Sequence, residues 1–207
     1  MNKRIVKSGL MHRIVSRGVA GALLLCASQS VLANELSYSF FEIDYIDGDF
    51  LDQSADGFGI SGSVGLGEMF FLGGSYQDEQ VDNFRFEGFN SDLDAELLRL
   101  GVGLHGALSD NVDWVVSLDY AKVELSALGN SDDDSGYIVD IGLRGLIGDA
   151  AEYSFAVIQS DVGGSETGFR VGGRYHFGDS NVSAGLDYVQ YESDWDQLAF
   201  GVRYQFD

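Results

Sequence analysis

Ten charged residues of this chain could form buried ion pairs. Five are arginines and five are acidic, and they stand in segments where large apolar residues alternate with glycine, alanine, serine and these charges. They are Glu42, Asp44, Arg99, Asp119, Asp140, Arg144, Arg170, Arg174, Asp187 and Arg203. A guanidinium offers a planar fork of donors that fits a carboxylate, and buried charge is tolerated only when it is paired. The pattern therefore predicts a network of ion pairs.

Two histidines raise the question of catalysis. His105 and His176 alternate with large apolar residues in the same way as the charged residues do. Ser109 and Asp110 lie close to His105 in the sequence. No grouping of Ser, His and Asp with a defined motif accompanies them, and a catalytic base must first reach the proton that it abstracts. We predict no catalytic residue and expect both histidines to be hydrogen-bonded to neighbouring carboxylates.

The elements that carry these residues are β-strands. A period of two runs from Leu36 to Phe206 and is clearest over residues 98–108, where leucines and a valine alternate with Arg, Gly, Gly, His and Ala. Ten such segments can be counted, and none has a helical period. Short turns fall at residues 67–68, 109–111, 148–150 and 179–181. Longer polar connections are expected at residues 47–56, 78–94, 126–135, 161–166 and 192–196.

The small residues decide what kind of sheet this is. The chain has 28 glycines and no proline, and the face opposite the apolar residues is Gly, Ala and Ser broken by charges. In a soluble sandwich that face would meet water and be rich in Lys, Glu and Thr, whereas a crowded barrel interior needs small residues. The apolar face ends in aromatic residues, as at a membrane interface. We predict an all-β fold, a transmembrane up-and-down antiparallel barrel of ten strands, with eight as the alternative.

The first 33 residues have the features of a cleaved secretory signal peptide. They hold five basic residues and no acid, then an apolar run over residues 19–27 that is too short to span a bilayer, and they end at Ala33. Translation could also start at Met11. Cleavage after Ala33 leaves residues 34–207 as the barrel domain, without the single cysteine, Cys26. Loss of the five bases would change the net charge from −21 to −26.

The end of the chain carries a resemblance to a known group. The sequence Gly201-Val202-Arg203-Tyr204-Gln205-Phe206 is similar to the C-terminal assembly signal of outer-membrane barrels, although Asp207 follows the phenylalanine. The mature chain resembles the small outer-membrane β-barrel proteins of Gram-negative bacteria, the group that contains OmpX and the membrane domain of OmpA. The resemblance implies an assembly signal at Gly201, Tyr204 and Phe206, and it implies the barrel-assembly machinery and periplasmic chaperones as partners.

The acidic connections have two interpretations. Carboxylates such as Asp132, Asp133 and Asp134 could hold Ca²⁺ or Mg²⁺ and so bridge to lipopolysaccharide, but the triplet lacks the spacing and closing glutamate of an EF-hand. A solvated acidic surface is favoured, and we predict no metal site and no cofactor. The aromatic residues Phe84, Phe86 and Phe89 either pack over the barrel mouth or form an adhesive patch.

The net charge and the inward position of the charged residues limit the possible functions. A net charge of −21 argues against nucleic acid, whose binding requires basic residues. The expected partners are outer-membrane lipid and lipopolysaccharide, and the expected state is a monomer. The ion pairs could rigidify a non-conducting barrel or line a narrow, cation-preferring pore. We favour a non-enzymatic structural or surface-interaction role in the cell envelope; a diffusion pore is the alternative, and an outer-membrane hydrolase is third.

Overall fold

The chain folds into ten β-strands over the residues that the structure describes. This computed structural model describes residues 36–50, 53–86, 89–178, 180–193 and 195–206. The strands are β1 (Phe40–Phe50), β2 (Gln53–Leu66), β3 (Phe70–Phe86), β4 (Phe89–Ser109), β5 (Val112–Ala127), β6 (Asn130–Ile147), β7 (Ala151–Asp161), β8 (Ser165–His176), β9 (Val182–Tyr191) and β10 (Trp195–Gln205). Among the described residues, no helix has the length and hydropathy of a membrane span.

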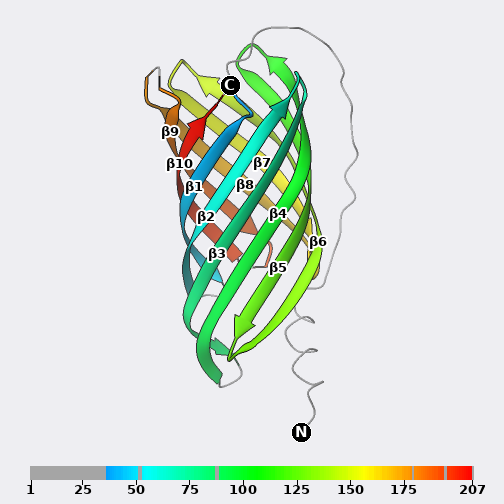
Figure 1. The fold of residues 1–207 in the computed structure, drawn as a ribbon, viewed down its shortest axis with the longest axis vertical. Coiled ribbons are helices and arrows are strands. Elements are labelled where there is room, and N and C mark those ends of the chain that lie inside the picture. The colour runs from blue at the N-terminus through cyan, green and yellow to red at the C-terminus, as the bar shows by residue number, and fades with distance from the viewer. Residues whose placement is uncertain (1–35, 51–52, 87–88, 179, 194, 207) are drawn as a thin grey trace.

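The sheet closes on itself as a barrel. Each strand pairs antiparallel with the strand before and after it, and β1 pairs with β10 from Phe40↔Gln205 to Phe50↔Trp195 (Figure 1). Closure gives every strand two neighbours, so no strand is left as a sheet edge. The predicted all-β, ten-stranded, up-and-down barrel is confirmed, and the eight-stranded alternative is excluded.

The two ends of the barrel differ. We call the end with Phe40, Gln205 and the turns after β2, β4, β6 and β8 the termini end, and the opposite end the hairpin end. At the hairpin end, at the bottom of the view, β3, β4, β5 and β6 extend furthest, and β4 is the longest strand with 21 residues (Figure 1). The β3–β4 hairpin is paired as far as Phe86↔Phe89.

The connections expected at residues 161–166 and 192–196 agree with the gaps between β7 and β8 and between β9 and β10, whereas those expected at residues 47–56, 78–94 and 126–135 were wrong. The strands continue through most of these three segments, so that only residues 51–52, 87–88 and 128–129 separate the two strands of each hairpin. A ladder hydrogen-bonds through the backbone, and acidic side chains can point outward without interrupting it. Leu128 (φ 54°) and Gly129 (φ 70°) both adopt the positive φ of a tight two-residue turn. Asn-Gly would have predicted this turn from the sequence, whereas Leu-Gly does not.

Apolar packing inside the barrel is concentrated toward the hairpin end. One buried cluster joins Ala55, Val81 and Leu93 of β2 to β4, with Leu125 and Ala127 of β5 against it. A second joins Ala121, Ile138 and Ile158 of β5 to β7, with Leu97, Val162, Val189 and Tyr191 against it. We call these two clusters the apolar layers. They draw on strands from both sides of the barrel and fill the lumen there with side chains.

Candidate functional site: the luminal cavity

All ten predicted charged residues lie around one cavity. The luminal cavity has a volume of about 360 Å³ and is lined by inward side chains from all ten strands. The period of two sends every second residue inward, so residues far apart in the sequence meet there. Three ion-pair clusters make up its charged wall.

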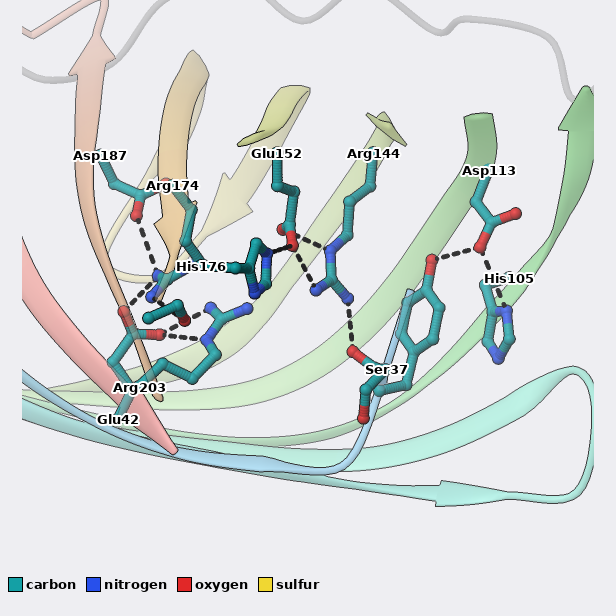
Figure 2. A network of polar contacts seen from close by, with 12 residues as sticks. Ser37, Glu42, His105, Asp113, Arg144, Glu152, Arg174, His176, Asp187 and Arg203 are labelled. Carbon is teal, nitrogen blue, oxygen red and sulfur yellow. Dashed lines mark hydrogen bonds and ion pairs between the residues drawn. The ribbon is translucent and has the colours of Figure 1, made fainter. Parts of the chain in front are cut away.

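The first cluster joins β1 to β8 and β10 through Glu42. Arg203 donates from Nε and Nη2 to Glu42 Oε2, at 2.8 and 2.6 Å, and Arg174 donates to Glu42 Oε1. The carboxylate is almost fully buried, with 4% of its side chain exposed. The Arg203 guanidinium also stacks over the Phe40 ring at 3.8 Å. Glu42 thus satisfies two arginines, and Figure 2 shows the three side chains converging.

The second cluster is centred on Arg99 of β4. Its Nη2 donates to Asp119 Oδ2 at 2.7 Å and to Asp140 Oδ2 at 2.8 Å. Ser117 supports it by donating its hydroxyl to the same oxygen of Asp119 at 3.1 Å. Arg170 approaches Asp140 only to 3.6 Å. Four strands, β4, β5, β6 and β8, are therefore tied together along one side of the lumen.

The third cluster contains an acid that the sequence interpretation missed. Arg144 forms a bidentate pair with Glu152, from Nε to Oε1 at 2.6 Å and from Nη2 to Oε2 at 2.9 Å. His176 Nε2 lies 3.2 Å from Glu152 Oε2 (Figure 2). Glu152 has the inward phase of β7, like Ser154 and Ala156, but it stands next to a turn, where the alternation was not extended.

Two further buried acids were missed: Asp113 also stands next to a turn, and Glu79 lies within the connection expected at residues 78–94. Asp113 begins the inward phase of β5, and its Oδ2 accepts a hydrogen bond from the Tyr38 hydroxyl at 2.9 Å and lies 3.7 Å from His105 Nδ1. Glu79 has the inward phase of β3 and accepts a hydrogen bond from the Gln197 amide. The phase of each strand would have found both residues, whereas nothing in the sequence marks Tyr38, which precedes the first strand.

Glycines opposite the luminal acids make room for the carboxylates. A Cβ on Gly101 would meet Asp119 Oδ1 at 2.3 Å, and one on Gly172 would meet Asp187 Oδ1 at 2.2 Å. A Cβ on Gly201 would meet both Asp44 Oδ1 at 2.2 Å and Glu42 Oε1 at 2.4 Å.

Three direct cross-strand pairs carry this arrangement. They are Asp44↔Gly201, Gly101↔Asp119 and Gly172↔Asp187. Each pair puts an acid on one strand beside an empty side-chain position on the next. Part of the glycine content thus serves the charged network directly.

The remaining predicted residues are less tightly engaged. Asp187 lies 3.9 Å from Arg174, and 31% of its side chain is exposed; Arg170 is exposed to the same extent. Asp44 lies beside Glu42 over Gly201. Asp140 Oδ1 is buried without a hydrogen-bond partner. The cavity therefore keeps some unused polar capacity on its charged wall.

The histidines contact carboxylates rather than nucleophiles. His176 contacts Glu152, and His105 lies near Asp113 with the Tyr38 ring stacked on it at 3.6 Å. Within the described ranges, neither histidine has a serine or threonine hydroxyl as a hydrogen-bond partner, and no group of three or more His, Cys, Asp or Glu side chains could hold a metal ion.

The side chains on the outer surface indicate what surrounds the barrel. Large apolar side chains on the outward phase of all ten strands are exposed, among them Leu100 at 56%, Ile141 at 52% and Phe200 at 52%. They form a continuous belt, with aromatic residues such as Phe41 and Tyr204 toward the termini end and Tyr45 and Phe58 toward the hairpin end. An exposed apolar surface of this extent requires lipid around it. The chain is a small transmembrane β-barrel.

Comparison with known proteins places the barrel among solved structures at the level of architecture. It is similar to the KdgM porin in complex with disordered oligogalacturonate (13% identity, TM-score 0.46), covering 80% of this chain and 99% of that one. It is also similar to Ail, the attachment invasion locus protein of Yersinia pestis (13% identity, TM-score 0.38), covering 81% of this chain and 97% of that one. A third similar structure is the Neisserial surface protein A (12% identity, TM-score 0.38), covering 82% of this chain and 98% of that one. No protein-family model and no characterised protein matches the sequence.

The predicted processing and assembly residues lie at the two ends of the chain. The predicted signal peptide, residues 1–33 with the cleavage point at Ala33, lies outside the described residues. Gly201 and Tyr204 lie in β10, where Tyr204 pairs with Phe41 and points toward lipid. The Phe206 amide donates to the Ser39 carbonyl at 3.0 Å. The residues of the predicted assembly signal thus lie along the seam where the barrel closes.

Proposed function

We propose that this outer-membrane barrel is non-enzymatic and non-conducting, with a structural and surface-interaction role in the cell envelope. The observation that carries the proposal is the set of ion pairs and apolar layers inside the barrel. Ion pairs in the middle and at the termini end link β1 to β10 and β8 and link β4 to β5 and β6, and the apolar layers occupy the hairpin end. In this proposal the termini end faces the periplasm, and the barrel is a monomer in the lipid.

The contents of the lumen oppose ion passage in two ways. A mobile ion would have to displace carboxylates from arginines that are already desolvated, which costs several kcal/mol for a buried pair. It would then meet the apolar layers, and an apolar constriction in a pore blocks ions by excluding water. A narrow, cation-preferring pore remains the alternative, supported by the cavity and its unused acidic groups.

The surface part of the proposal rests on the strands that rise above the belt. Outward acids of β3, β4 and β5 stand directly opposite one another there, in the pairs Asp78↔Glu96 and Glu96↔Glu124, whereas Lys122 contacts both members of the next pair, Glu124↔Asp133. Directly opposed like charges repel, and divalent cations would relieve the repulsion while bridging to lipopolysaccharide phosphates. Gly201, Tyr204 and Phe206 would serve as the signal read by the barrel-assembly machinery after periplasmic chaperones deliver the chain.

Planar-bilayer recording of the purified protein tests the function. We expect no steady unitary conductance, because the ion pairs and the apolar layers obstruct the lumen. A gel-mobility shift between boiled and unboiled samples confirms that the sample is folded before it is added. Steady unitary currents from folded protein would overturn the proposal and favour the diffusion pore, and the ratio of cation to anion permeability would then test its predicted preference.

The enzyme alternative has its own test. A hydrolase would need a nucleophile beside His105 or His176, and both histidines instead contact carboxylates. We expect His105→Ala and the wild-type protein to release fatty acids or peptides at the same background rate. A hydrolytic activity that His105→Ala abolishes would overturn the non-enzymatic assignment.

A further inference from the structure

Three residues that precede the first strand lie inside the termini-end mouth of the barrel. Leu36 and Tyr38 are buried, at 7% and 8% exposure, although neither belongs to a strand. Tyr38 lines the luminal cavity. We call Leu36–Tyr38 the plug segment, since it occupies the mouth at which the tight turns leave the lumen.

Tyr38 makes four contacts with the barrel wall. Its hydroxyl donates to Asp113 Oδ2 at 2.9 Å, and its ring stacks on His105 at 3.6 Å with an interplanar angle of 12°. The guanidinium of Arg144, on β6, lies 4.9 Å from the centroid of the Tyr38 ring. The ring of Phe71, on β3, has its centroid 5.5 Å from that of Tyr38. A single side chain thus contacts four strands across the mouth.

The backbone of the plug segment is bound to the third ion-pair cluster. Arg144, already held by Glu152, donates from Nη1 to the Ser37 carbonyl at 2.7 Å. Figure 2 shows Ser37 at the end of the line of polar contacts that runs from Glu152 through Arg144. The plug segment therefore uses the one donor of Arg144 that points away from the carboxylate.

The plug segment can leave without breaking a strand. The first residue tied to the sheet by its backbone is Ser39, whose carbonyl accepts from the Phe206 amide at 3.0 Å and whose hydroxyl accepts from the Gly65 amide at 3.0 Å. Movement about Ser39 would cost only the contacts of Ser37 and the two buried side chains. Opening of the hairpin end would instead require the apolar layers to unpack, and those side chains belong to the strands themselves.

We propose that Leu36–Tyr38 is a releasable plug that closes the luminal cavity at the termini end, with Ser39 as its hinge. The cavity then exchanges solutes with the solution at this mouth alone, when the plug segment swings out. Local openings of this kind cost less free energy than global unfolding and occur at chain segments with few contacts. The property is separate from conduction, because the plug segment lies at one end of the barrel and the apolar layers lie toward the other.

A cysteine reporter in the cavity measures the closure. Ser75→Cys places a thiol on the neutral wall of the cavity, in a protein whose only cysteine, Cys26, is changed to Ser. The modification rate by a small charged methanethiosulfonate is measured with Tyr38 intact, with Tyr38→Phe and with Tyr38→Ala. We expect Tyr38→Ala to react at least about tenfold faster than the intact protein, as loss of the ring opens the mouth.

The controls separate plug release from a loss of fold. Tyr38→Phe keeps the stacking and loses only the hydroxyl bond to Asp113, so we expect an intermediate rate. A thiol at Ser180, exposed in the turn before β9, should react equally fast in all three backgrounds, and the gel shift on boiling should be unchanged. Equal Ser75→Cys rates in intact protein and Tyr38→Ala, or a rate in intact protein as fast as at Ser180→Cys, would overturn the proposal.

Discussion

The role of individual residues in this barrel is clearest at glycines that face a carboxylate. Gly201 leaves the space into which Asp44 and Glu42 extend, with hypothetical Cβ contacts of 2.2 and 2.4 Å. Gly173, on the neighbouring outward phase of β8, has nothing within 4 Å of the same position. The two residues are chemically identical. Only the side chains around them decide whether a larger residue could replace the glycine.

Gly201→Ala should destabilise the barrel by about 1–3 kcal/mol, because overpacking displaces side chains that are already paired. Gly173→Ala is the matched control and should change the stability by less than about 0.5 kcal/mol, as for a substitution that touches nothing. The measurement is urea unfolding in micelles, followed by the fluorescence of Trp114 and Trp195. Equal midpoints for the two variants would contradict the assigned role of Gly201.

A single buried acid gives a pH dependence. Glu79 lies on the hairpin side of the apolar belt, is 6% exposed, and accepts a hydrogen bond from Gln197. Burial, and to a lesser degree the neighbouring Asp78, raises the pKa of Glu79 to about 7. A raised pKa in the folded state means that the charged form opposes folding. The cost appears as pH rises above the unfolded value and is complete above about pH 7.

Glu79→Gln should therefore stabilise the barrel by about 1–3 kcal/mol at pH 8 and by almost nothing at pH 4. The amide of the new glutamine can still accept the Gln197 hydrogen bond through its oxygen. Unfolding midpoints of the variant and the wild type across this pH range measure the effect, and Glu68→Gln, in the exposed turn after β2, is the control. A difference between Glu79→Gln and wild type that does not grow with pH would refute the assignment.

At the scale of elements, adjacent strands are joined by side-chain pairs in addition to the backbone ladder. Arg144 of β6 and Glu152 of β7 form a bidentate pair, and both side chains are at most 10% exposed. On the outside, Lys122 of β5 contacts Asp133 of β6 at 3.7 Å, and both side chains are more than a third exposed. The same chemistry thus occurs in two environments that differ mainly in water.

Arg144→Ala should cost about 3–5 kcal/mol of stability, since it leaves the Glu152 carboxylate buried and unpaired. Lys122→Ala should leave the unfolding midpoint almost unchanged, as for an exposed pair. Replacing both Arg144 and Glu152 with apolar residues should recover much of the loss. A double-mutant cycle in urea measures the coupling, and additive single effects would show that the pair is not a unit.

At the scale of the whole molecule, the closed ladder should make folding visible on a gel. A closed barrel with no free edge resists detergent below its unfolding temperature. Unboiled protein in dodecyl sulfate should therefore migrate differently from boiled protein, with a single cooperative change between the two bands as temperature rises. Identical migration before and after boiling would contradict the barrel.

Most of the fold could be predicted from local pattern. Strand phase follows from alternation alone, because side chains in a strand have a period of two, and it placed all ten predicted charges around the cavity. Hairpin lengths could not be predicted, since a backbone ladder continues beneath acidic side chains as readily as beneath apolar ones. Glu152, Asp113 and Glu79 could have been found by extending each phase to its turn.

The sequence by itself determined which side chains face the lumen and which face lipid, because that choice depends only on the alternation within each strand. The tertiary structure decided which charges pair, since the partners Glu42, Arg174 and Arg203 come from strands that meet only when the barrel closes. It also decided where Tyr38 lies. A residue outside the ladder has no period, and its position depends on contacts with four strands that exist only in the closed barrel.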